Sequence, residues 1–232
     1  MFIIKHLPNF LTCCNLFCGC VAIVSVLNGN MEMGAWLTLI AAVFDFADGM
    51  AARLLKAYSD IGKELDSLAD CVTFGVLPGA VMFSLLQKAS TDQWLPYTGF
   101  LISIFSALRL AKFNVDTRQT SSFIGLPTPA NALFINFLPL IILIAPSSAM
   151  AQWLTQLPVL LALTIGFSWL LVSPIPLFSL KFKNLSWNDN KVAYVFLLVT
   201  LGLVIWGGVL AVPATIVWYI VWSVISGKIL RW

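Results

Sequence analysis

Long apolar stretches alternate with short polar or turn-forming segments along the whole chain. A helix needs about 20 mostly apolar residues to cross a bilayer. The hydropathy of the chain and the positions of its turn-forming residues therefore predict eight spanning helices. They cover residues 10–28, 33–55, 62–87, 94–114, 126–146, 152–172, 191–208 and 211–229. Turn signals such as Asn28-Gly29-Asn30 and Gly207-Gly208 separate them. The pattern therefore predicts an all-α, polytopic membrane helix bundle.

Composition supports this prediction. Hydrophobic residues make up 60% of the 232 residues and charged residues only 10%, which lies far outside the range of a soluble globular domain. Polar stretches long enough to form a separate soluble domain are missing from the sequence. We therefore expect residues 1–232 to form a single integral membrane domain.

The positive charges predict the orientation of the bundle. With both termini in the cytoplasm, the inward-facing segments contain every Lys and Arg of the sequence except Lys88. Inner loops of membrane proteins are enriched in Lys and Arg. The eight-helix arrangement with cytoplasmic termini, in a membrane of the bacterial inner-membrane type, is therefore the expected one.

Acidic residues are concentrated where a membrane protein should avoid them. Six of the ten lie between Asp45 and Asp70, at the inner ends of the second and third predicted helices. Asp45 lies about ten residues inside its helix, where an ionised carboxylate costs on the order of a few kcal/mol unless it is paired, hydrated or bound to a metal. This cost indicates that the carboxylate has a function.

The spacing of the carboxylates indicates a metal site. Asp45 and Asp48 are three residues apart, and Asp66 and Asp70 are four apart, so each pair shares one face of its helix. Two helices joined by a short turn pack antiparallel, which lets these faces meet. Four converging carboxylates repel one another unless cations lie between them, and oxygen ligands suit Mg²⁺ or Mn²⁺. Two such ions can assist a displacement at phosphorus.

Neighbouring residues fit a phosphate-containing ligand. Gly49 and Gly62 lack side chains where the backbone has to approach a ligand or another helix, and Arg53 offers a guanidinium to phosphate oxygens. Ser59 or Asp60 is a candidate cap for the third helix. A purely structural charge network is the alternative interpretation.

The stretch Asp45-x2-Asp48-Gly49-x2-Ala52-Arg53-x8-Gly62-x3-Asp66-x3-Asp70 resembles the signature of the CDP-alcohol phosphatidyltransferase family. The resemblance implies a six-helix catalytic core, here about residues 1–175, that is usually dimeric. Two additional helices, about residues 190–230, follow that core. No nucleic-acid partner is expected.

The resemblance also implies roles for the residues of the motif. It makes Asp70 the candidate general base and implies two divalent cations, Mg²⁺ or Mn²⁺. The implied metal ligands are Asp45, Asp48, Asp66 and Asp70, and the implied nucleotide and pyrophosphate contacts are Asp48, Gly49, Ala52, Arg53 and Gly62. Asn15, a polar residue inside the first helix, either contacts the nucleotide or bonds a neighbouring helix.

Further segments resemble the branch of this family that uses serine as the acceptor. These are Leu7-Pro8-Asn9 to Asn15, Gly62 to Asp70, Phe74-Gly75-Val-Leu-Pro78, Arg109-Leu-Ala-Lys-Phe-Asn114 and Gly125-Leu-Pro-Thr-Pro-Ala130. A serine carboxylate and hydroxyl would find partners in the basic cluster formed by Arg109, Lys112, Asn114 and Arg118. The same cluster suits glycerol 3-phosphate or inositol phosphate, and it also satisfies the positive-inside rule without any substrate.

The expected activity is transfer of the phosphatidyl group from CDP-diacylglycerol to serine, with CMP as the other product. Another acceptor for the same chemistry remains an alternative. A cation transporter, which also uses buried carboxylates, is an alternative from a different class. A transporter has no need of Arg53 beside the carboxylates or of the glycine spacing.

Overall fold

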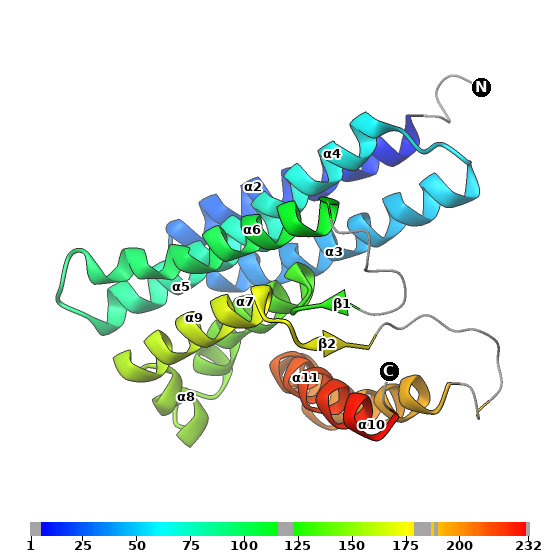
Figure 1. Ribbon diagram of the computed structural model, residues 1–232. Coiled ribbons are helices and arrows are strands. Elements are labelled where there is room, and N and C mark those ends of the chain that lie inside the picture. Colours follow the sequence, from blue (N-terminus) through cyan, green and yellow to red (C-terminus); the bar gives the residue numbers. More distant parts are fainter. Residues whose placement is uncertain (1–5, 116–122, 179–186, 188–189, 231–232) are drawn as a thin grey trace.

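The computed structural model describes residues 6–115, 123–178, 187 and 190–230. The prediction for Arg118 falls outside these ranges. Helices dominate the described chain (Figure 1). In chain order the elements are α2 (Leu7–Leu27), α3 (Met31–Leu54), α4 (Asp60–Asp70), the π-helix η1 (Cys71–Val76), α5 (Leu77–Ala89), the 3₁₀-helix η2 (Leu95–Phe100), α6 (Leu101–Val115), β1 (Phe123–Ile124), α7 (Thr128–Ile144), α8 (Ala149–Leu154), α9 (Leu157–Val172), β2 (Pro176–Leu177), α10 (Lys191–Gly207), the 3₁₀-helix η3 (Gly208–Leu210) and α11 (Ala211–Leu230).

Each of the eight predicted segments contains a helix, so the predicted all-α class is confirmed. Two details differ from the prediction. The segment predicted at 152–172 is divided into α8 and α9, and the strands β1 and β2 form a two-residue antiparallel ladder between Phe123–Ile124 and Pro176–Leu177. Sequence periodicity did not indicate either feature, because a six-residue helix and a two-residue strand are too short to produce a pattern.

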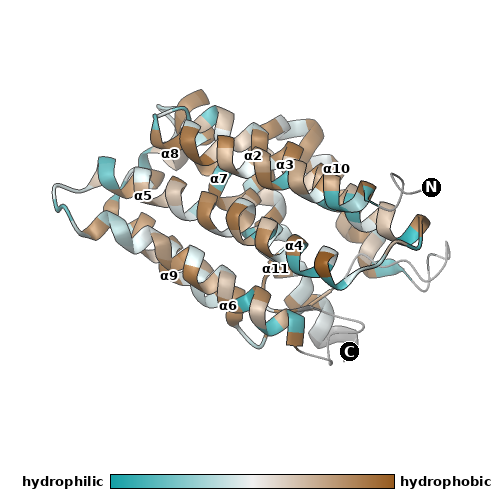
Figure 2. Cartoon of the chain, turned by 90° about the horizontal axis from the view of Figure 1, so that it is seen from above, coloured by the Kyte–Doolittle hydropathy of each residue, from teal (hydrophilic) through white to brown (hydrophobic). Residues whose placement is uncertain are grey.

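Five helical stretches of the described chain are long and apolar enough to cross a membrane: Leu7–Leu27, Met31–Leu54, Asp60–Ala89, Leu95–Val115 and Lys191–Gly227. Helices α7 and α9 are apolar but shorter. Large apolar side chains such as Phe17, Phe46 and Trp206 are mostly exposed on the bundle surface. Figure 2 shows hydrophobic residues along the lengths of the helices. Such a surface suits lipid as its solvent, so the chain is an integral membrane protein.

Helices α2 and α3 form an antiparallel pair that packs on α4, α5 and α7 (Figure 1). A buried polar bond joins two of these helices: the Asn136 amide of α7 donates to the Thr38 hydroxyl of α3 over 2.8 Å. The largest buried apolar cluster includes Leu77, Met82, Ile102 and Ile135. Its members come from many helices, which fixes the bundle around α5.

The long helix from Asp60 to Ala89 changes its hydrogen-bonding pattern immediately after Asp70. Pro78 has no backbone N–H to donate to the carbonyl four residues earlier, and its ring crowds that carbonyl. The chain therefore widens into a π-helix over Cys71–Val76, in which the Leu77 N–H bonds Val72 O. Single π turns often lie at functional sites, and this one positions the end of α4.

The start of α7 is bonded to the end of α9. The Gly125 N–H donates to Ile175 O over 3.0 Å, and the Leu126 N–H donates to Leu170 O over 2.9 Å. Gly125 has a φ of +79°, and a Cβ at this position would lie 2.5 Å from Leu171 O. Only glycine fits both the conformation and the space.

Helices α10 and α11 pack against the rest of the bundle through aromatic residues. Phe178 contacts Phe196 of α10 and Tyr219 of α11 at ring-centroid distances of 5.3 and 5.2 Å. The Tyr219 hydroxyl donates to Phe178 O over 2.9 Å. These contacts join the two C-terminal helices to the segment that follows α9.

Gly99 is the point at which η2 approaches α5 most closely. A Cβ on Gly99 would lie 2.6 Å from the backbone nitrogen of Phe83, whereas a Cβ on Gly202 of α10 would meet nothing within 4 Å. We expect Gly99→Ala to destabilise the fold by about 1–3 kcal/mol, because the α5 backbone has to move. Gly202→Ala is the control and should leave the thermal unfolding temperature in detergent unchanged or higher. Equal unfolding temperatures for the two variants would contradict this packing.

Candidate active site

Three carboxylates converge between the C-terminal half of α3 and the middle of α4. One oxygen each of Asp45, Asp48 and Asp66 lies within 4.8 Å of the others. Asp48 is buried, and the other two are half-buried. The i, i+3 spacing on α3 places Asp45 and Asp48 on one face, and α4 presents Asp66 to that face. We call these three residues the aspartate cluster.

The turn between α3 and α4 sets this geometry. Helix α3 ends with Ala57 N–H bonded to Ala52 O over 3.0 Å and Lys56 N–H bonded to Arg53 O over 3.3 Å. Lys56 adopts a φ of +49°, the left-handed conformation that commonly ends a helix. Ser59 then caps α4, because its Oγ accepts a 3.0 Å bond from the Gly62 N–H. Of the two predicted caps, the structure selects Ser59.

The cluster has the properties of a cation site. Three carboxylate oxygens this close repel one another, and the buried Oδ1 of Asp66 has no hydrogen-bond partner. A buried oxygen without a donor is costly unless a ligand supplies the missing interaction. The donors are all oxygens, as Mg²⁺ and Mn²⁺ prefer. The residues therefore fit a divalent cation.

Helix α2 supports the cluster with two polar side chains. The Thr12 hydroxyl donates a 2.6 Å hydrogen bond to Asp48 Oδ2, and the Asn15 amide donates to Asp70 Oδ1 over 3.3 Å. The Thr73 hydroxyl in turn donates to Asn15 O over 3.2 Å. Thr12 and Asn15 are buried, so α2 fixes the direction of one carboxylate from each of the other two helices.

Asp70 lies beside the cluster and is not one of the three residues that come within 4.8 Å of one another. Its charge interacts with those of Asp45, Asp66 and Asp48. Asp70 is the last residue of α4 before the π-helix. Of the four predicted metal ligands, the structure gathers three closely and places the fourth next to them, bonded to Asn15.

A cavity of about 250 Å³ opens beside the cluster. We call it the inner cavity. Its lining includes five of the six predicted nucleotide contacts, namely Asp48, Gly49, Ala52, Arg53 and Gly62. Asn15 is not part of this lining, so the structure supports the alternative in which it bonds a neighbouring helix.

The lining also contains residues that sequence reasoning did not assign. Asn9 and Thr12 enter from α2, and Lys63 enters from α4. A Cβ on Gly62 would lie 3.0 Å from Asn9 Oδ1, so this glycine allows α4 to approach α2. Asn9 could have been identified from the sequence, because it is a polar residue in the first turn of a predicted membrane helix.

The predicted acceptor residues differ in their surroundings. Arg109 of α6 is buried, its Nε has no hydrogen-bond partner among the described residues, and its charge interacts with that of Asp70. Lys112 is exposed. The side-chain amide of Asn114 donates to Ser67 Oγ over 2.9 Å, and the backbone carbonyl of Asn114 accepts a 3.4 Å bond from Lys63 Nζ. Asn114 therefore joins α6 to α4, and Arg109 alone of these three combines burial with a free donor.

One further buried polar residue escaped the sequence analysis. Asn131 of α7 is fully buried, and neither its amide nitrogen nor its amide oxygen has a partner. The Thr128 hydroxyl, one turn earlier, is also buried without a partner. The motif from Gly125 to Ala130 ended one residue before Asn131, which could have been identified as a polar residue inside an apolar helix.

Comparison with known proteins identifies the family of the chain. Residues 5–170 match the sequence model described as CDP-alcohol phosphatidyltransferase. The chain therefore belongs to the CDP-alcohol phosphatidyltransferase family, and the aspartate cluster lies within the matched region.

Several curated relatives carry the same printed name, CDP-diacylglycerol–serine O-phosphatidyltransferase. The protein of this name from Bacillus subtilis is 38% identical over 176 residues, which cover 74% of this chain and 89% of that protein. Its Mycobacterium bovis counterpart is 34% identical and covers 94% of this chain and 75% of its own. A Helicobacter pylori protein is 35% identical over 55% of this chain and 54% of its own.

Removal of one carboxylate from the cluster should have opposite effects with and without a cation. We expect Asp66→Asn to raise the unfolding temperature of the metal-free protein, because it relieves repulsion with Asp45 and Asp48. The same variant should lose most of the rise that Mg²⁺ produces in the wild type, and its Mn²⁺ affinity should fall roughly tenfold or more.

Glu64→Gln is the matched control, because Glu64 is exposed two residues away on the same helix. Thermal unfolding with and without Mg²⁺, together with electron paramagnetic resonance of Mn²⁺, measures both effects. An unchanged Mn²⁺ affinity in Asp66→Asn would exclude Asp66 from the cation site.

Proposed function

We infer that the protein transfers the phosphatidyl group of CDP-diacylglycerol to the hydroxyl of L-serine and releases CMP. The aspartate cluster beside the inner cavity is the observation that carries this inference, because it joins a cation site to space for a phosphate-containing ligand. The printed names of the relatives supply the acceptor, serine. The membrane-embedded bundle suits a reaction in which one substrate and one product are lipids.

The reaction is a displacement at phosphorus. The serine hydroxyl oxygen forms a bond to the lipid-side phosphorus of CDP-diacylglycerol, and the bond from this phosphorus to the bridging oxygen breaks. CMP leaves with that oxygen and its electron pair. Asp70 accepts the hydroxyl proton, so atoms and charges balance. The positioning of the reactants supplies a large share of the catalysis in such a reaction.

Asp70 has the surroundings that a proton acceptor needs. The Asn15 amide donates to Asp70 Oδ1, which fixes the direction of the carboxylate, and the Asp70 side chain also lies within hydrogen-bond reach of Asp45. Because Asp70 lies at the edge of the aspartate cluster, next to Asp45, it can contribute to the cation site and also accept the proton of the serine hydroxyl. We propose this division of roles for the four aspartates.

We propose that Asp45, Asp48 and Asp66, with Asp70 beside them, hold two divalent cations, Mg²⁺ or Mn²⁺. When bound, these ions neutralise charge on the pyrophosphate and polarise its oxygens. Arg53, Gly49, Ala52 and Gly62 line the cavity that would receive the cytidine and pyrophosphate groups. Arg53 supplies the guanidinium for phosphate oxygens.

We propose Arg109 as the main contact of the serine carboxylate. It is buried, has an unpartnered Nε and interacts with the charge of Asp70. A guanidinium matches the two oxygens of a carboxylate. Lys112 and Arg118 are proposed as a basic approach to the site, and Asn114 as a residue that holds α6 against α4.

The proposed orientation places the active site and both termini in the cytoplasm, because Lys and Arg gather at the inner segments. We further propose a homodimer, on the resemblance of the motif, and a catalytic core of about residues 1–175 followed by two additional helices. Light scattering of the purified protein measures the oligomeric state.

The choice of acceptor is tested by incubating the purified protein with CDP-diacylglycerol and labelled serine, glycerol 3-phosphate or inositol phosphate. We expect label from serine to enter lipid with stoichiometric CMP release and only when Mg²⁺ or Mn²⁺ is present. Incorporation of another acceptor in its place would leave the family chemistry intact and refute serine. Ion flux across vesicles without CMP release would indicate a transporter.

Asp70→Asn should abolish turnover, with kcat lowered about 100-fold or more, because the proton acceptor is lost. The unfolding temperature of the metal-free protein should not fall below that of the wild type, because the substitution relieves repulsion with Asp45 and Asp66. Asp60→Asn, an exposed carboxylate at the start of α4, is the matched control and should retain activity. Turnover equal to the wild type in Asp70→Asn would remove this residue from the mechanism.

Arg109→Gln should raise the KM for serine roughly 10- to 100-fold, because a charged hydrogen-bond donor to the carboxylate is lost. The KM for CDP-diacylglycerol should change little. Arg109→Lys should recover part of the serine affinity, since it keeps the charge and loses the planar fork. Equal increases in both KM values would indicate a structural role for Arg109.

A further inference from the structure

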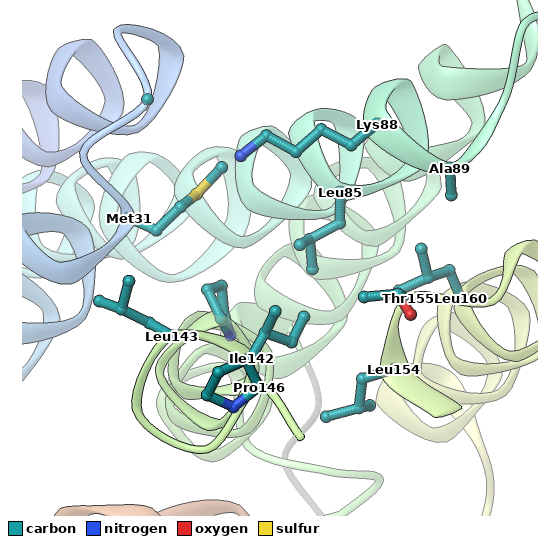
Figure 3. A pocket seen from close by; sticks show the side chains of 12 residues that line it. Met31, Leu85, Lys88, Ala89, Ile142, Leu143, Pro146, Leu154, Thr155 and Leu160 are labelled. Carbon is teal, nitrogen blue, oxygen red and sulfur yellow. The ribbon is translucent and has the colours of Figure 1, made fainter. Parts of the chain in front are cut away.

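A second cavity, of about 440 Å³, lies far from the aspartate cluster. We call it the outer cavity. Figure 3 shows apolar side chains from several helices around it and the Lys88 side chain reaching across it toward Met31. Its lining consists of Gly29, Met31, Leu85, Lys88, Ala89, Pro139, Ile142, Leu143, Pro146, Leu154, Thr155 and Leu160. Its volume falls in the range of about 300–1,000 Å³ that ligand sites occupy.

Helix length places the outer cavity at the opposite membrane surface from the active site. Asp66 and Lys88 belong to one continuous helical stretch, Asp60–Ala89. At about 1.5 Å per residue, the 22 positions between them correspond to roughly 33 Å. The hydrocarbon core of a bilayer is about 30 Å thick. Lys88 therefore lies near one interface when the aspartate cluster lies near the other.

Lys88 is the distinctive group of this cavity. It is the sole cation of the lining and the sole Lys or Arg of the sequence outside the predicted inner segments. Lys88 is exposed. Within the described part of the chain no carboxylate of the cavity lining pairs with its ammonium group, and an ammonium at the rim of an apolar cavity is complementary to an amphiphile with a negative head.

We propose that the outer cavity binds an anionic phospholipid of the outer leaflet, with its phosphate on Lys88 and one acyl chain along the apolar wall. The wall is formed by Leu85, Ile142, Leu143 and Leu160. Burial of the apolar surface of the acyl chain against this wall favours binding. Pairing of the lipid phosphate with the Lys88 ammonium at the interface adds to the binding affinity.

The composition of the cavity selects this occupant over two simpler ones. A free phosphate would use Lys88 but would leave the apolar wall empty. An uncharged lipid would use the wall and leave the ammonium unpaired. Lys88 also lies in the last turn of α5, where a cation interacts favourably with the negative end of the helix dipole. That role alone requires no cavity beside the residue.

Pro139 and α8 contribute to the shape of the cavity. Pro139 lies inside α7, where it lacks the N–H that would bond the carbonyl four residues earlier. The short helix α8 adds Leu154, and Thr155 follows it directly. The cavity is thus assembled from helices that are distant in sequence, outside the motif that carries the proposed reaction.

The test uses the whole purified protein in neutral detergent with phosphatidylglycerol or phosphatidylcholine of matched chains, without substrates. Native mass spectrometry counts the retained lipids, and thermal unfolding reports their effect. We expect phosphatidylglycerol to be retained and to raise the unfolding temperature more than phosphatidylcholine does. Lys88→Gln should weaken phosphatidylglycerol binding about fivefold and remove the preference. Lys88→Arg should keep it.

Two further variants separate the site from other causes. Lys191→Gln removes an exposed cation from the start of α10 and should retain the wild-type preference. Leu143→Trp fills the cavity from its exposed rim and should weaken binding of both lipids. The proposal is overturned if Lys88→Gln retains phosphatidylglycerol as the wild type does, or if inorganic phosphate alone reproduces the thermal shift. Serine transfer is not measured, so failure here is distinct from failure of the proposed function.

Discussion

Repulsion among the carboxylates of the aspartate cluster is the constraint on which the site depends. Asp45, Asp48 and Asp66 are held with oxygens within 4.8 Å of one another, and all three are buried or half-buried. Such a group is unfavourable without positive charge. The fold holds the carboxylates together through the packing of α2, α3 and α4, and so provides a site whose electrostatic deficit a divalent cation relieves.

Helix α2 contributes more to the geometry of the candidate active site than its apolar sequence suggests. Thr12 and Asn15 orient Asp48 and Asp70, and Asn9 lies against Gly62. Preorganised ligands lower the cost of binding, because less ordering is needed when the ligand arrives. The helix is therefore a support for the site as well as a membrane span. The π-helix after Asp70 adds a second support, since it sets how α4 continues into the buried α5.

The two cavities lie toward opposite ends of the helix bundle. The lining of the inner cavity includes acidic, basic and amide side chains, whereas the lining of the outer cavity is apolar except for Lys88 and Thr155. An enzyme whose substrate and product are lipids works within one leaflet, and the proposed lipid on Lys88 would hold the opposite end of α5, α7 and α9 together. Because α5 continues directly from α4, the two ends share one helix.

The sequence alone determined the helical segments, because apolar runs of membrane length admit few other structures. It also determined the pairing of carboxylates on helix faces, because a spacing of three or four residues is a local property of the helix. Gly62 and Arg53 were predicted near the site from what their residue types offer a phosphate-containing ligand, and Ser59 was one of two predicted caps of the third helix. The family was evident from these residues before any contact was known.

The tertiary structure decided what depends on contacts between distant segments. It placed Asp70 at the edge of the aspartate cluster and bonded Asn15 to it. It also buried Arg109, left Lys112 exposed, and assembled the outer cavity from five helices and their turns. None of these follows from periodicity, because the direction of a side chain across an interface depends on how two helices are rotated against each other. That rotation is set by the packing of the whole bundle.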